Sequence, residues 1–174
     1  KDYFVNKKYY DGDFTLHTGK NRVKHHLSAK NQDKFRITFV DTGLESLTGE
    51  RVRRIAKYID GDTFMLTYGD GLADINIAKL LGHHLDKKSI GTVTGVNPML
   101  KYGGFDADEK GRVLRFERKT RIRHLINGGF MVFKNEVLDM ISENSMIEEL
   151  FPKLAAIGQL SLYKHRGKWK AMDT

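Results

Sequence analysis

A single carboxylate between two glycines offers the clearest chemistry in this sequence. Asp70 stands between Gly69 and Gly71, directly after the apolar, β-prone run 63–68. This run predicts a buried strand, and ligands of open α/β sheets bind outside the carboxyl ends of the strands. Asp70 is therefore expected where a metal ion or a ligand hydroxyl would bind. A tight turn is the alternative, since Asp and Gly are also ordinary turn residues.

Two other stretches could hold a ligand through backbone groups. In Asn127-Gly128-Gly129 the backbone can come close to a ligand because glycine has no Cβ, and a β-bulge or bend is the alternative. Thr48 is a plausible helix N-cap, and Arg51 follows it three residues later. A helix N-terminus beside an arginine can bind phosphate, although surface arginines are common.

Strands and helices that alternate along the chain must position these groups. The pattern indicates an α/β sheet, mostly parallel, that a hairpin makes mixed. Asp74 is expected to cap the second helix, with Ile77, Leu80, Leu81 and His84 on its buried side. The expected strands are 14–16, 35–40, 63–68, 89–96, 104–107, 112–116, 130–133 and 160–165, and the expected helices are 48–59, 74–84, 136–141 and 148–157.

Composition limits the classes of protein to consider. The 174 residues suggest one domain, 1–174, and carry a net charge of +8, which favours an anionic partner such as a nucleotide or a sugar phosphate. There is no apolar run long enough to span a bilayer, and the absence of cysteine fits a cytoplasmic protein. No nucleic-acid-binding motif is evident, so a nucleic-acid partner is not expected.

The first 33 residues are rich in aromatic and basic side chains. The stretch 19–33 is expected to be an exposed loop or a subunit contact of a homo-oligomer. Its adjacent His25 and His26 make a poor metal pair, because neighbouring side chains point in different directions.

Five motifs in order resemble the sugar-1-phosphate nucleotidylyltransferases, and most closely their cytidylyl branch. Any one of them is weak, but together they cover most of the chain from Val40 on. They are Val40-Asp-Thr-Gly43, Thr48-Gly-Glu-Arg51, Thr67-Tyr-Gly-Asp-Gly71 with Asp74, Ile126-Asn-Gly-Gly-Phe130 and His165-Arg-Gly-Lys-Trp169-x-x-Met172-Asp-Thr174.

This resemblance implies a Rossmann-like mixed sheet flanked by helices and the transfer of a cytidylyl group from CTP to a sugar 1-phosphate, giving a CDP-sugar and pyrophosphate. It also implies that Asp70 and Asp173 bind one Mg²⁺. Such an ion takes one or two carboxylates together with phosphate oxygens and water. The reaction would need positioning and charge neutralisation rather than a covalent intermediate.

Further site residues follow from the same resemblance. Ser46, Arg51 and Gly69 are expected beside the nucleotide. Glucose 1-phosphate is the expected sugar phosphate, and its binding residues are expected to be Gly103, Glu117, Lys119, Asn127 and Gly128.

The glycine-rich loop with which the family cradles the triphosphate is not in this sequence. Roughly sixty residues of the family pattern are expected to precede Lys1, judging from typical βαβ lengths. Another base or sugar, or an inactive homologue that serves as a binding or regulatory subunit, is the alternative to the cytidylyltransferase.

Overall fold

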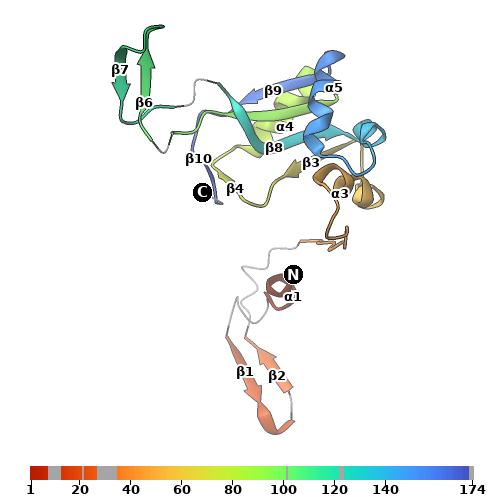
Figure 1. Cartoon of the computed structure of the whole chain (residues 1–174). Helices are drawn as coiled ribbons and strands as arrows, with labels where there is room; N and C mark the ends of the chain where they lie inside the picture. The colour runs from red at the N-terminus through yellow and green to blue at the C-terminus, as the bar shows by residue number, and fades with distance from the viewer. Residues whose placement is uncertain (8–12, 21, 27–34, 101, 122–123, 173–174) are drawn as a thin grey trace. The chain divides into compact units, whose positions relative to one another are not determined.

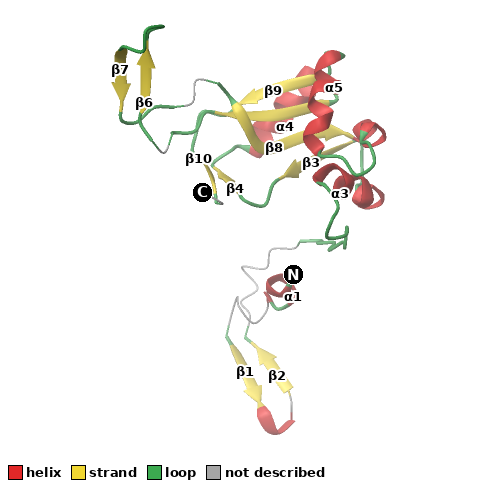
Figure 2. Ribbon diagram, in the orientation of Figure 1, coloured by secondary structure: helices red, strands yellow, loops and turns green. Residues whose placement is uncertain are grey.

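The computed structural model describes residues 1–7, 13–20, 22–26, 35–100, 102–121 and 124–172. These residues form two compact units, Lys1–Asp41 and Thr42–Thr174, each built from helices and strands (Figures 1 and 2). Within the described ranges, no helix has the length and apolar character needed to cross a membrane.

The first unit contains a short helix and a hairpin. Helix α1 spans Asp2–Val5, and strand β1 (Phe14–His17) pairs antiparallel with β2 (Arg22–His25). The turn η1 (Thr18–Lys20) joins the two strands. The expectation of a loop over 19–33 is therefore wrong for β2, because this turn folds the chain back so that β2 bonds to β1.

The expected strand 35–40 is not formed. None of the strands that the structure describes pairs with this stretch, and Phe35, Ile37 and Phe39 are 68%, 42% and 48% exposed. An alternating apolar pattern makes a strand only where a neighbour accepts and donates its backbone hydrogen bonds.

A four-stranded mixed sheet in the order β3-β8-β5-β9 forms the centre of the second unit. Strand β8 is antiparallel to both β3 and β5, whereas β5 and β9 are parallel. Three of the four strands thus run in one direction, and the expected mixed α/β fold is confirmed. However, β8 makes the sheet mixed, whereas the hairpin expected to do so pairs separately, and β5 with β9 is the one parallel pairing among the described strands. The strands are β3 (Thr63–Thr67), β5 (Gly91–Val96), β8 (Ile126–Lys134) and β9 (Leu160–Lys164).

Helices cover both faces of this sheet (Figure 2). On one face, Val93, Met131 and Phe133 join the apolar cluster to which α3 and α5 contribute Val52 and Leu154. Strand alternation places Thr92 and Val132 on the opposite face. The helices are α3 (Thr48–Ile55), α4 (Ile77–Lys87) and α5 (Leu150–Ala156), with 3₁₀ turns η3 (Ala56–Tyr58), η4 (Asn135–Met140) and η5 (Ile147–Glu149).

Helix α4 covers the Thr92 face. Leu80 and His84 are each 1% exposed, as the sequence predicts, whereas Ile77 in the first turn is 43% exposed, so its expected burial is wrong. His84 Nδ1 lies 2.8 Å from Thr92 Oγ1. Burial lowers the pKa of His84. The expected cap Asp74 is wrong: the helix begins after Asn76, whose side chain accepts the Lys79 N–H at 2.9 Å. An Asx side chain caps only from the residue that precedes the first turn.

Two further pairs of strands, among the described residues, complete the second unit. The expected hairpin consists of β6 (Gly104–Ala107) and β7 (Val113–Glu117), joined by a turn in which Asp108 binds the Lys110 and Arg112 N–H groups. The short strands β4 (Gly71–Ala73) and β10 (Trp169–Ala171) form an antiparallel ribbon.

A buried carboxylate joins α3 to the loop before η5. Glu50 is 2% exposed, and its carboxylate accepts hydrogen bonds from Arg53, Arg54 and the Asn144 N–H. The hydrogen bonds from Arg53, then from Arg54, lower the pKa of Glu50 from 4.5 to about 2. The folded state therefore favours the ionised carboxylate.

We expect Glu50→Gln to weaken the acid dependence of folding. The contribution of Glu50 is fully present above its unfolded pKa of 4.5 and is lost as the pH falls toward 2. Thermal unfolding followed by circular dichroism should show a lower Tm than wild type at pH 7. Between pH 5 and 2 the variant should lose less stability than wild type.

Glu136→Gln is the matched control, since Glu136 is exposed and its ion pair with Lys134 spans 3.7 Å. Equal pH dependence of wild type and Glu50→Gln would contradict the assigned role of Glu50.

Candidate functional site

The two glycines of β8 form a bulge beside the end of β3. The register between β5 and β8 shifts between Val93 and Gly95, and Gly129 has φ of +77°. A Cβ on Gly128 would lie 2.6 Å from the Val96 Cγ1 atom, so this position requires glycine. The bulge that the sequence left as an alternative is therefore present.

The bulge turns two carbonyl groups toward neighbouring segments. The Gly128 carbonyl accepts a hydrogen bond from Trp169 Nε1 at 2.8 Å, and the Gly129 carbonyl accepts the Tyr68 N–H at 3.1 Å. The end of β3 and the C-terminal ribbon strand are thereby attached to the same point of β8.

The ribbon brings the C-terminal end of the described chain to Asp70. Ala171 pairs with Gly71 across β10 and β4, and the Met172 N–H donates to the Asp70 carbonyl at 2.8 Å. Asp173 is the next residue in the sequence and lies outside the described residues. Its expected role as a second metal ligand stays a prediction.

Asp70 itself lies exposed at the carboxyl end of β3, as expected. The expected burial of this strand is wrong, because β3 is the edge strand of the sheet and its residues are half-buried or exposed. Among the residues that the structure describes, the Asp70 carboxylate forms no hydrogen bond or ion pair, and no group of three His, Asp or Glu side chains gathers for a metal ion. A carboxylate free of protein partners is available to a cation that takes its other ligands from phosphate and water.

A cavity of about 720 Å³, the α3 cavity, lies beside Asp70. Gly69 and Arg51 line it together with Asp70, and Tyr68 donates a hydrogen bond to Glu148 there. Burial, and then this carboxylate, raise the pKa of Tyr68. The lining residues are Thr42, Thr48, Arg51, Val52, Ile55, Leu66, Thr67, Tyr68, Gly69, Asp70, Ile147 and Glu148.

The N-terminus of α3 is occupied by the protein itself. The N–H groups of Gly49 and Glu50 donate to the Ser145 carbonyl at 2.9 and 3.2 Å, so the expected phosphate site at this helix end is wrong. The N-cap is Leu47 instead of Thr48, whose hydroxyl accepts the Ile147 N–H at 3.0 Å. These bonds fix α3 to η5, so the N–H groups of Gly49 and Glu50 are not available to a ligand in this cavity.

Arg51 and Ser46 stabilise the loop that borders the α3 cavity. The Arg51 guanidinium donates to Thr42 Oγ1 at 2.9 Å and to the Leu44 carbonyl at 2.8 Å. Ser46 Oγ donates to the Thr42 carbonyl at 2.5 Å but does not line the cavity. Arg51, Gly69 and Asp70 thus line the α3 cavity together. Ser46 contributes only through its hydrogen bond to Thr42, which lines the cavity.

A second cavity of about 1050 Å³, the ribbon cavity, is walled by β10. Its charged residues are one carboxylate, Asp74, and four cations. These cations are Arg121, Arg166, Lys168 and Lys170. Sequence reasoning missed them, although basic residues at 164, 166, 168 and 170 show the period of two that places side chains on one face of an extended chain.

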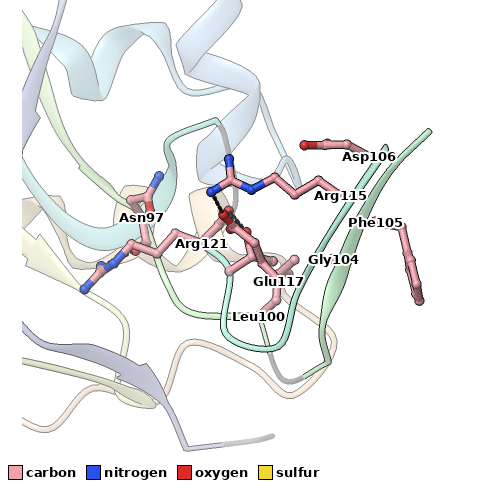
Figure 3. A pocket seen from close by; sticks show the side chains of 9 residues that line it. Asn97, Leu100, Gly104, Phe105, Asp106, Arg115, Glu117 and Arg121 are labelled. Atoms are coloured by element: carbon pink, nitrogen blue, oxygen red, sulfur yellow. Dashed lines mark hydrogen bonds and ion pairs between the residues drawn. The ribbon is translucent and has the colours of Figure 1, made fainter. Parts of the chain in front are cut away.

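The expected sugar-binding residues are spread over several places. Glu117 lines the hairpin cavity of about 630 Å³, where it pairs with Arg115 (Figure 3). Asn97, Leu100 and Arg121 line this cavity and the ribbon cavity alike, so the two adjoin.

The other expected sugar residues have local structural roles. Asn127 accepts the Gly129 N–H at 3.0 Å, and Gly128 forms the bulge. A Cβ on Gly103 would lie 2.6 Å from the Phe116 ring, so Gly103 permits the hairpin to pack. Lys119 is exposed and lines none of the three cavities.

Comparison with known proteins agrees with this arrangement. A family model described as nucleotidyl transferase matches residues 15–174. The glucose-1-phosphate cytidylyltransferases of Salmonella typhi and Salmonella typhimurium are each 36% identical to the chain over 178 residues, which cover 100% of this chain and 68% of each relative.

A solved structure shares the fold. The crystal structure of HddC from Yersinia pseudotuberculosis has a TM-score of 0.52 at 21% identity and covers 72% of this chain. The chain in turn spans 56% of that protein's length. The mixed sheet, the full-length identity and the family model lead to one conclusion: the chain belongs to the nucleotidyl transferase family, among the sugar-1-phosphate nucleotidylyltransferases.

Proposed function

We propose that the protein transfers a cytidylyl group from CTP to a sugar 1-phosphate, with glucose 1-phosphate as the expected acceptor, and releases pyrophosphate. One observation carries this proposal: the segment 66–74 separates two cavities of different character. Residues 66–70 line the α3 cavity, and Asp74 lines the ribbon cavity with β10. Two substrates on either side of Asp70 would have their phosphates close together.

The α3 cavity suits a nucleotide. Ile55 and Leu66, which are half-buried, offer apolar surface for a flat base, and the buried Val52 and Ile147 lie behind it. Asp70 stands at one end of this lining, where a cation could bind it and a phosphate together. The α3 cavity is therefore proposed to hold CTP, with Arg51 and Gly69 among its contacts.

The ribbon cavity suits a sugar phosphate. Four cations and one carboxylate give it a net charge of +3, from Arg121, Arg166, Lys168 and Lys170 against Asp74. Clustered cations attract a phosphate dianion and can donate several hydrogen bonds to it. The sugar is proposed to extend toward the adjoining hairpin cavity and Glu117, with Gly103, Lys119, Asn127 and Gly128 as further proposed contacts.

The donor set fits a divalent cation of the Mg²⁺ type. Asp70 is exposed and free of partners within the described ranges, and the chain passes it one residue before Asp173. We therefore assign Asp70 and Asp173 to hold Mg²⁺, which would supply charge neutralisation to the phosphates. The protein's own part is to hold both substrates so that the sugar phosphate oxygen faces the nucleotide α-phosphorus in line.

The relatives support the choice of base. Both Salmonella proteins are named as cytidylyltransferases acting on glucose 1-phosphate, and their identity of 36% extends over the whole of this chain. The segments that line the α3 cavity fall inside this aligned range.

We expect Asp70→Asn to reduce pyrophosphate release from CTP and glucose 1-phosphate by at least about 100-fold, since even outer partners of a metal site contribute 10- to 100-fold. The amide keeps the shape of the side chain but loses its charge. A coupled pyrophosphate assay on the full-length protein with Mg²⁺ measures this. Asp86→Asn, an exposed carboxylate on α4, is the control and should be unaffected. Wild-type rates in Asp70→Asn would remove the metal assignment.

The base preference is tested by binding alone. With Mg²⁺ present, CTP should raise the Tm of the full-length protein more than equal concentrations of UTP or dTTP, because ligand binding to the folded state stabilises it according to affinity. A thermal-shift series gives this comparison. Identical shifts for the three nucleotides would refute cytidine specificity while leaving the family unchanged.

A further inference from the structure

The carboxylate of Asp74 is bound by the loop that precedes β10. Its Oδ1 atom accepts the Lys168 N–H at 2.7 Å and lies 3.0 Å from His165 Nε2. The Asp74 N–H in turn donates to the Lys168 carbonyl at 3.2 Å. Asp74 and Lys168 are therefore joined in both directions, directly beside the first ribbon pair, Ala73 with Trp169.

The loop is shaped to admit this carboxylate. A Cβ on Gly167 would lie only 2.2 Å from Asp74 Oδ1 and 2.7 Å from the His165 ring. No side chain could be accommodated there without displacing Asp74. Gly167 thus allows the backbone between His165 and Lys168 to close around the carboxylate.

Trp169 attaches β10 to the central sheet. Its indole N–H donates to the Gly128 carbonyl at the β8 bulge. Together with Asp74, this bond attaches β10 to two elements before the chain reaches Met172 and Asp70. A shift of β10 along β4 would have to break both attachments.

We propose that Asp74 is a positioning residue for the metal site: by binding the Lys168 N–H, it fixes the register of β10 against β4 and so the point at which the C-terminal chain passes Asp70. The inference rests on the proposed function, because this register matters only where Asp70 and Asp173 share a cation. Asp74 acts through the backbone and need not touch the cation.

We assign the positioning of β10 to the hydrogen bond that Asp74 accepts from the Lys168 N–H, and not to the charge of Asp74. The Asp74 side chain is 55% exposed, although that of His165 is 10% exposed, and solvent around Asp74 weakens its pairing with His165. The Lys168 N–H needs an acceptor oxygen at this place, and an asparagine amide also provides one. Asp74→Asn should therefore keep the function that Asp74→Ala loses.

Trp169 gives a readout that does not depend on turnover. It is the single tryptophan of the chain, and it lies on the strand in question. In the full-length protein, with any tryptophan outside these 174 residues replaced by phenylalanine and with CTP present, addition of Mg²⁺ should change the emission of Trp169. A titration gives the apparent metal affinity. The matched controls are Asp86→Asn on α4 and Gly82→Ala, where an added Cβ meets no atom within 4 Å.

We expect Asp74→Ala and Gly167→Ala each to weaken the apparent Mg²⁺ affinity by about 10- to 100-fold, the usual effect of losing support behind a metal ligand. Asp74→Asn should stay close to wild type, as should the two controls. The Tm of each variant shows how far the fold itself has been weakened.

Three results would overturn the inference in distinguishable ways. Wild-type metal affinity in Asp74→Ala would show that Asp74 positions nothing. Equal loss in Asp74→Asn and Asp74→Ala would assign the effect to charge instead of the backbone contact. A wild-type protein with neither an Mg²⁺ response nor pyrophosphate release would remove the proposed function, and the inference with it.

Discussion

One backbone hydrogen bond, from the Met172 N–H to the Asp70 carbonyl, joins the two parts of the chain on which the proposed chemistry depends. Asp70 lies in the turn that follows β3 of the central sheet, while Met172 lies at the far end of the second unit in sequence. The pairing of β4 with β10 brings them together. A cation that needs two carboxylates from distant positions requires such a connection, because neither position alone forms a metal site.

The connection depends in turn on a defect in the sheet. An unbroken β8 would direct its carbonyls only to its neighbours in the ladder, but the bulge at Gly128 and Gly129 offers the Gly128 carbonyl to Trp169 Nε1. Glycine is required there, since the space of a Cβ at Gly128 is taken by Val96. Gly128, which the family resemblance assigns to the sugar, therefore also holds the strand that leads to the proposed metal ligands.

Local sequence patterns predicted the central strands and helices well. They failed where a residue distant in the sequence determines the structure. The run before Asp70 is apolar and β-prone, so β3 and the exposed carboxylate after it could be predicted. The stretch 35–40 has an equally good pattern but no described partner strand. The phosphate site expected at Thr48 was wrong because Ser145, almost a hundred residues away, takes the N–H groups of α3. Asp74 was expected to cap the helix that follows it. It binds instead to the loop 165–168, of which Lys168 is 94 residues away in the sequence.

The most direct measurement is anomalous scattering from crystals of the full-length protein grown with CTP and Mn²⁺ in place of Mg²⁺. The account predicts a manganese peak about 2.1 Å from a carboxylate oxygen of Asp70, the distance of a small hard cation, with Asp173 as its second protein ligand. A manganese ion bound to CTP with Asp70 and Asp173 pointing to separate surfaces would contradict it.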